Sequence, residues 1–160
     1  MAVTVKKVVL WRRELDNRPG ALAGVLEPLA RAGADLQIAM GYRLPGNESQ
    51  AVVELAPVTG KKSTALAQDA GLQPSAIPAL IATGDNRPGL GYALSRGMAD
   101  ARINMAFLVA QVMGRKYSAI FGFESAADAD RAVAVIKTAA RAKAAPAKKA
   151  ARAKRKRRRR

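Results

Sequence analysis

The five residues Asp16–Gly20 read Asp-Asn-Arg-Pro-Gly, and the same five letters return as Asp85–Gly89. Each copy follows an apolar run typical of a β-strand and precedes a segment with the apolar spacing of a helix. An Asn or Asp side chain can bond back to the local backbone, proline fits a first helical turn, and glycine permits close approach. The repeated stretch therefore predicts two strand-to-helix turns.

The two copies indicate an internal duplication. An offset of 69 residues, from Asp16 to Asp85, also brings Asp35 onto Asn104. A single copy could simply start a helix, but two identical copies in the same setting favour a repeated module. Each turn leaves backbone N–H groups unpaired at a helix N-terminus, where they can bind a small anion.

The turn, the apolar helix after it, and then Gly33–Leu36 or Arg102–Met105 at the start of the next strand resemble the ACT domain family. This resemblance implies an α+β fold of two tandem ferredoxin-like βαββαβ units with antiparallel sheets. It also implies regulatory domains that bind amino acids and act on metabolic enzymes or transcription. We therefore expect ACT-like units at residues 1–75 and 76–140, followed by a disordered Lys/Arg/Ala-rich tail at 141–160.

Composition excludes several classes of function. The chain has neither histidine nor cysteine, so it lacks the residues of Ser-His-Asp or Cys-His catalysis, of disulfides and of the usual zinc sites. The acidic residues are scattered and form no metal-binding loop. We expect no enzyme activity, no metal and no cofactor. No apolar run approaches the ~20 residues of a membrane span, and no signal-peptide pattern is present, so we expect a cytoplasmic protein.

The positive charge is concentrated at the C-terminal end. Residues 141–160 hold 12 of the 28 basic residues and no acidic residue, which leaves 16 basic against 12 acidic residues elsewhere. Such a run binds phosphate by charge without choice of sequence, although it can also serve only as a solubilising polycation. The candidate nucleic-acid-binding residues are Lys154, Arg155, Lys156, Arg157, Arg158, Arg159 and Arg160.

A zwitterionic amino acid suits the predicted turns. Helix N–H groups can bind its carboxylate, and an asparagine oxygen can accept from its ammonium group. In ACT domains that bind serine, two asparagines hold the amino acid at an interface between domains. The resemblance transfers these positions to Asn86 and Asn104, which we expect to face one another because one helix joins them. The alternative is that both asparagines only satisfy turn backbone.

The first unit departs from this pattern, because Asp35 stands where the second unit has Asn104 and would repel the ligand carboxylate. Gly91 replaces Leu22 of the first unit, which leaves room either for a ligand or for close helix–sheet packing. We therefore place the intact site in the second unit. The candidate ligand-binding residues are Asn86, Gly89, Leu90, Gly91 and Asn104, with Asn17, Gly20 and Asp35 in the first unit.

Two functions from different classes follow. The first is a non-catalytic regulatory protein that binds a small amino acid at ACT interfaces and transmits occupancy to a partner. The second is a nucleic-acid-associated protein that uses the basic tail, with the ACT units serving for dimerisation. Because four-stranded sheets of this kind keep open edges, we expect side-by-side ACT pairing, within the chain or in a homodimer.

Overall fold

A computed structural model describes residues 3–142, which form two α+β units with antiparallel sheets, as the sequence predicts. The basic residues 154–160 lie outside this described part. The helices are α1 (Ala21–Arg31), α2 (Lys61–Asp69), α3 (Leu90–Asp100) and α4 (Ala126–Arg141). The strands are β1 (Val3–Val8), β2 (Trp11–Asp16), β3 (Ile38–Leu44), β4 (Asn47–Ala56), β5 (Gln73–Pro74), β6 (Ala79–Asp85), β7 (Met105–Met113) and β8 (Lys116–Phe123).

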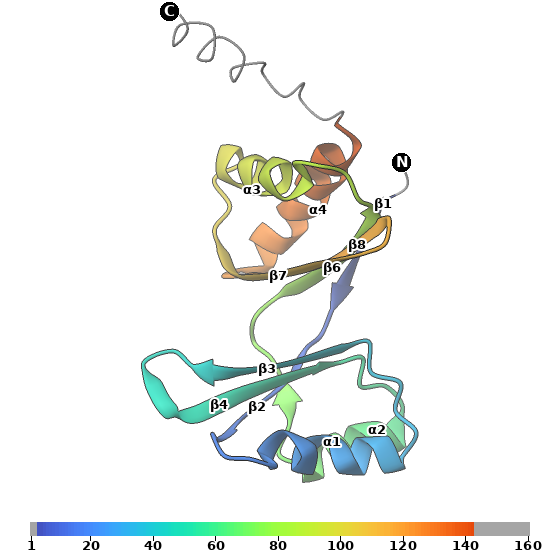
Figure 1. The fold of residues 1–160 in the computed structure, drawn as a ribbon, viewed down its shortest axis with the longest axis vertical. Coiled ribbons are helices and arrows are strands. Elements are labelled where there is room, and N and C mark those ends of the chain that lie inside the picture. Colours follow the sequence, from blue (N-terminus) through green and yellow to red (C-terminus); the bar gives the residue numbers. More distant parts are fainter. Residues whose placement is uncertain (1–2, 143–160) are drawn as a thin grey trace, which may run out of the picture.

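The two sheets lie in the middle of the molecule and the helices cover their outer faces (Figure 1). One sheet has the strand order β3-β4-β2-β5 and is covered by α1 and α2. The other has the order β1-β6-β8-β7 and is covered by α3 and α4. The sheets therefore do not join edge to edge within residues 3–142, so the predicted side-by-side pairing inside the chain is wrong for this part of it.

The N-terminal strand differs from the prediction. The sequence predicts one strand from Val3 to Glu14 in the first unit, but the structure divides it. Residues of β1 pair antiparallel with β6, from Val3↔Gly84 to Val8↔Ala79, and β2 alone belongs to the first sheet. Figure 1 shows the chain passing from one sheet to the other between these strands. The predicted boundary at residue 75 therefore places β1 in the first unit, although β1 completes the sheet of the second unit.

The reason lies in what the second unit lacks. A ferredoxin-like sheet needs a fourth strand beside its first, and the short β5 fills that position for the first unit through its pairing with β2. After α4 the sequence contains only Ala, Lys, Arg and Pro, without a strand-forming run. The N-terminal Val3–Val8 takes the vacant edge of β6 instead, and its Val3 and Val5 pack against the core of the second unit.

Each unit has its own core between sheet and helices. In the first, Val25 and Leu29 of α1 pack on Trp11 and Leu55. In the second, the apolar stripe of α3 packs on β8 and α4, with Phe121 and Phe123 fully buried or nearly so. Both helices lie where the apolar spacing after each turn predicts a helix. Among residues 3–142, no helix is long and apolar enough to cross a membrane.

A third cluster joins the two sheets. Leu10, Ile38 and Ala56 from the first unit meet Ala79 and Ile120 from the second. Leu10 lies in the break between β1 and β2 and is completely buried, because both sheets cover it. The junction therefore depends on the same short segment that carries the chain between the units.

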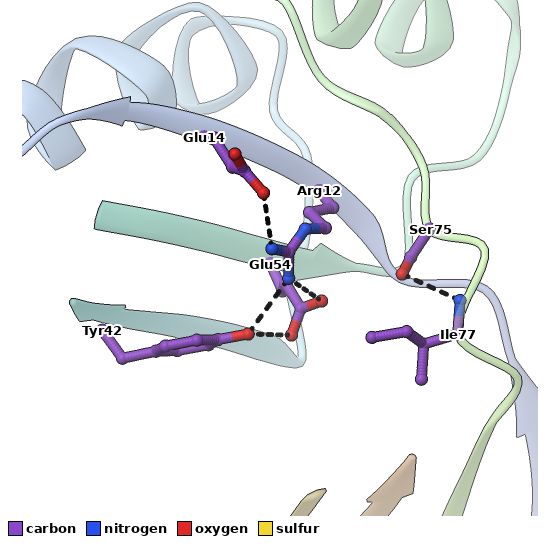
Figure 2. Close-up of polar contacts among 6 residues, drawn as sticks. All are labelled: Arg12, Glu14, Tyr42, Glu54, Ser75 and Ile77. Atoms are coloured by element: carbon purple, nitrogen blue, oxygen red, sulfur yellow. Dashed lines mark hydrogen bonds and ion pairs between the residues drawn. The ribbon is translucent and has the colours of Figure 1, made fainter. Parts of the chain in front are cut away.

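One buried charge belongs to the first sheet. Glu54 on β4 is 0% exposed, and Figure 2 shows Arg12 and Tyr42 converging on its carboxylate from the neighbouring strands. Arg12 Nη1 lies 3.4 Å from Glu54 Oε1, and Tyr42 Oη donates to Glu54 Oε2 at 3.3 Å. Burial, followed by the Glu54 charge, raises the pKa of Tyr42, so Tyr42 remains a neutral donor.

Candidate functional site

The second Asp-Asn-Arg-Pro-Gly turn connects β6 to α3 as the sequence predicts. Asn86 is tied to the sheet because its backbone N–H donates to the Arg115 carbonyl at 2.8 Å. Gly89 is the N-cap of α3 and has a left-handed φ of 77°, which favours glycine. Since glycine has no side chain, no side chain caps this helix end. The first turn of α3 therefore presents N–H groups that a ligand can bind.

A cavity of about 170 Å³ adjoins this helix end. It lies between α3 and the strands β7 and β8. Three of the predicted site residues line it, namely Asn86, Leu90 and Gly91. Two further polar residues line it from the sheet, Gln111 on β7 and Tyr117 on β8. Only Tyr117 has its side chain on the face that α3 covers, because Gln111 pairs with Ser118 on the alternate positions of β8. The turn, the helix start and the sheet thus meet around one space.

Gly91 explains why this space is open. A Cβ added at Gly91 would have no atom within 4 Å, whereas close helix–sheet packing would have placed one there. In the first unit Leu22 occupies the corresponding helix position, and its Cδ2 lies 3.7 Å from where a Cβ of Gly41 would be. The leucine therefore covers the strand that glycine leaves uncovered in the second unit. Of the two predicted explanations for Gly91, open space is the one observed.

Asn104 does not join this site within the chain. It follows the C-terminal end of α3, whose 11 residues span about 16 Å at 1.5 Å per residue. Its Nδ2 donates to Glu124 Oε1 at 2.6 Å. The expectation that Asn86 and Asn104 face one another within one unit is therefore wrong, because the connecting helix separates them. Gly89 does not line this cavity either, and it lines a groove between α3 and α4 instead.

The first unit arranges its turn differently. Asn17 donates from Nδ2 to the Glu48 carbonyl at 2.9 Å, so its amide satisfies the hairpin backbone. Gly20 lines a separate, polar pocket of about 470 Å³ that also contains Arg13 and Arg18. Neither Asn17 nor Asp35 lines that pocket. The three predicted residues of the first unit are therefore not brought together.

Tyr117 is the site residue that the sequence reasoning missed. Its side chain is 5% exposed, and its hydroxyl has no hydrogen-bond partner among the described residues. Burial raises the pKa of this phenol, so it stays protonated at neutral pH. The only signal in the sequence is a tyrosine at a strand position that faces the helices, where the neighbouring Ala119 and Phe121 are apolar.

The charged groups near the turn lie outside the cavity. Lys116 Nζ contacts Asp85 Oδ1 at 2.5 Å, and this hydrogen bond lowers the pKa of Asp85. Neither residue is among those that line the 170 Å³ cavity, and none of the lining residues is charged. Within residues 3–142, no three His, Cys, Asp or Glu side chains are placed to hold a metal ion. The lining of the cavity is therefore uncharged and mostly apolar.

Several solved structures are similar to this chain. A Bacteroides thetaiotaomicron protein superposes with a TM-score of 0.67 at 15% identity, over 84% of this chain and 89% of its own. The ligand-free regulatory subunit of aspartate kinase from Thermus thermophilus superposes with a TM-score of 0.58 at 15% identity, over 87% of this chain and 97% of its own. The regulatory subunit of aspartate kinase from Thermus flavus superposes with a TM-score of 0.56 at 16% identity, over 87% of this chain and 97% of its own. No family model and no curated protein sequence matches.

These similarities define the class of fold. At such low sequence identity they concern the architecture, and the coverage shows that both units take part. The described residues have the tandem ACT fold that the turn motifs predict.

Proposed function

We propose that the chain is a non-catalytic cytoplasmic regulatory protein that binds a small amino acid in the second unit and transmits occupancy to a partner. The observation that carries this proposal is the cavity in which Asn86 and the uncapped start of α3 meet the space left by Gly91. The fold supports it, since similar structures include regulatory subunits of aspartate kinase.

The chemistry of the cavity suits a zwitterion. The carboxylate of the ligand accepts from the N–H groups of the first turn of α3, where the helix dipole also favours an anion. The ammonium group donates to the side-chain oxygen of Asn86, which lines the same space. Neutral amide acceptors avoid the cost of burying a full opposing charge.

A second copy of the chain would complete the site. β7 is an edge strand of its sheet, and its side chains Leu108, Val109, Val112 and Met113 are 40–72% exposed. If two copies pair antiparallel along β7, the start of one strand lies beside the end of the other. That arrangement places the partner's Asn104 next to the cavity of the first copy. We propose a homodimer of this kind, which also covers the open edge.

Calorimetry against the twenty amino acids tests the proposal. We expect at least one to bind the full-length protein, and we expect Asn86→Ala to weaken its binding about tenfold, the effect of losing one or two hydrogen bonds. Asn104→Ala should weaken the binding of the same amino acid if a second copy of the chain completes the site. Asn17→Ala is the matched control and should leave affinity unchanged, because Asn17 bonds only to the hairpin backbone. Absence of heat with all twenty would contradict the proposal.

Gly91→Leu should abolish binding while the protein remains folded. The new leucine side chain fills the cavity, just as Leu22 covers the corresponding strand in the first unit. The variant should fold, because leucine is more favourable than glycine in a helix by about 1 kcal/mol. Gly24→Leu makes the same change in α1, also into open space, and should leave binding in the second unit intact. Thermal unfolding checks that both variants fold. Retained affinity in Gly91→Leu would place the ligand outside this cavity.

The basic end of the chain supports a second candidate function, association with nucleic acid. We expect a chain ending at residue 142 to lose most of its DNA affinity relative to the full chain, because the deleted stretch carries 11 of the 12 basic residues of 141–160. In a salt series, log K of the full chain should fall steeply with log salt, by about 0.9 per phosphate contact, and the truncated chain should show a much shallower slope. Equal affinity and slope for both chains would remove this candidate.

A further inference from the structure

A groove of about 840 Å³ runs between α3 and α4, the two helices that cover the outer face of the second sheet (Figure 1). The helices are antiparallel. Arg87 Nη2, at the start of α3, donates to the Ala139 carbonyl near the end of α4 at 2.9 Å, and Arg131 of α4 donates to the Ala101 carbonyl at the end of α3. Two packed helices of this kind leave a surface groove in which the ridges of a third helix can lie.

Small residues form much of the groove, and one large side chain stands out from them. Gly97 lets the helices touch, because a Cβ added there would lie only 2.9 Å from Val135 Cγ1. Ala93 and Ala134 add only methyl groups to the walls. Tyr92 also lines the groove, and its side chain is 75% exposed. Tyrosine is one of the residues that dominate the energy of protein interfaces, so Tyr92 is placed to anchor a partner.

The groove distinguishes the second unit from its own duplicate. The offset of 69 residues places Ala23 where the second unit has Tyr92, and Glu27 where it has Arg96. The groove beside α1 and α2 is smaller, at about 500 Å³, since α2 has 9 residues and α4 has 16. An exposed tyrosine adds nothing to the core and is a poorer helix former than alanine. The difference therefore indicates a surface for interaction.

Positive charge gathers at one end of this groove. Arg87 has no carboxylate partner among residues 3–142, and its hydrogen bonds go to backbone carbonyls. Arg96, further along α3, is neutralised by Asp100 at 2.9 Å. Ala142, at the end of α4, lines the groove, and residues 143–160 that follow it in the sequence contain 11 basic residues and no acidic residue. This end of the groove therefore attracts carboxylates.

We propose that the groove between α3 and α4 docks an acidic amphipathic helix of the partner protein. Its apolar side chains lie against the groove and Tyr92, and its carboxylates lie at the end near Arg87. This inference rests on the proposed function and deepens it by naming the surface and the chemistry of the partner. The first turn of α3 belongs to both sites, because Leu90 and Gly91 line the ligand cavity while Gly89 and Tyr92 line the groove.

A displayed library of helix-forming peptides tests the inference. Peptides of about 15 residues are long enough, because the 11 residues of α3 span about 16 Å. Selection uses the full-length protein with an excess of free peptide 143–160, which removes sequences that bind only the basic run. We expect the selected peptides to carry apolar residues three and four positions apart, with Asp and Glu toward one end. No amino acid is added, so this result is independent of the ligand cavity.

Three variants locate the bound peptide. Tyr92→Ala should weaken the best selected peptide at least tenfold in fluorescence anisotropy, the effect of losing an interface anchor. Ala134→Glu places a carboxylate in the exposed wall of the groove and should weaken it at least as much. Lys137→Glu is the matched control. It is exposed on the same helix, does not line the groove and changes the net charge more, yet it should weaken binding less than about threefold.

The outcomes separate the two proposals. If no peptide is selected while calorimetry finds an amino acid, the inference about the groove is overturned and the amino-acid site stands. If selected peptides depend on Tyr92 but no amino acid binds, the amino-acid site fails and the groove stands. Selected peptides without acidic residues, or equal weakening by Lys137→Glu and Ala134→Glu, also overturn the inference. If duplex DNA instead of a peptide loses affinity in Tyr92→Ala, the groove is a nucleic-acid surface and the inference is overturned.

Discussion

Deleting residues 1–8 is expected to unfold the second unit, although its other secondary structure lies about seventy residues further along the chain. The deletion removes all six residues of β1, whose backbone pairs with β6 over its whole length. It also removes Val3 and Val5 from the core of that unit, a loss of about 3 kcal/mol of apolar burial. This is a large share of the 5–15 kcal/mol that stabilises a typical domain.

Hydrogen exchange resolved along the chain measures this effect, because it reports each unit separately. We expect protection to be lost in α4 and β6 and retained in α1 and β4, whose core contains no residue of β1. Val5→Asp should reproduce part of the loss, since Val5 faces the core, while Thr4→Asp on the exposed face of the same strand should not. Full protection of α4 in the deleted chain would show that the second unit folds without β1.

Features that neighbouring residues determine could be predicted from the sequence, whereas features that depend on contacts between distant parts of the chain could not. The two turns and the buried faces of α1 and α3 follow from neighbouring residues, so their repetition and spacing predict them. The destination of Val3–Val8 depends on which sheet edge lacks a strand, and that is a property of the whole chain. An apolar run of strand type pairs equally well with either unit on local grounds, so the sequence pattern could not divide it.

The candidate site shows the same division. Comparison of the repeats singled out Gly91, because the corresponding residue is Leu22, and the open space beside Gly91 agrees with the ligand interpretation. The family resemblance and the single helix that joins the two positions predict Asn104 beside Asn86, but the length of α3 keeps the two apart. For Tyr117 the sequence shows only a tyrosine at a strand position with apolar neighbours, and its unpaired hydroxyl becomes visible only once helix and sheet enclose it. A polar group can be recognised as unsatisfied only after its surroundings are known.

Arg12→Met is expected to lower the free energy of unfolding by about 2–3 kcal/mol, with a fall in unfolding temperature of roughly 5–10 °C. Arg12 is the cation nearest the fully buried Glu54, and its removal leaves that carboxylate with only the Tyr42 hydroxyl (Figure 2). We place the effect below that of a completely buried pair because the Arg12 side chain is 25% exposed. Thermal and urea unfolding of the full-length protein measure it.

Glu14→Ala is the matched control for the charge of Arg12. Arg12 Nη2 contacts Glu14 Oε1 at 2.8 Å, a shorter distance than its contact with Glu54, but the Glu14 side chain is 52% exposed. An exposed pair contributes little because water and salt screen it, so Glu14→Ala should cost less than about 1 kcal/mol. If distance rather than burial decided the energy, Glu14→Ala would be the more damaging of the two variants.

The double variant Arg12→Met with Glu54→Met separates two explanations of the loss. If the cost of Arg12→Met arises from an uncompensated buried carboxylate, replacing that carboxylate as well removes the cost, and the double variant should recover most of the wild-type stability. If the ion pair itself supplied the stability, the double variant would remain as unstable as Arg12→Met. Because Glu54 is completely buried and its bond to Arg12 is long at 3.4 Å, desolvation outweighs attraction here, and we expect recovery.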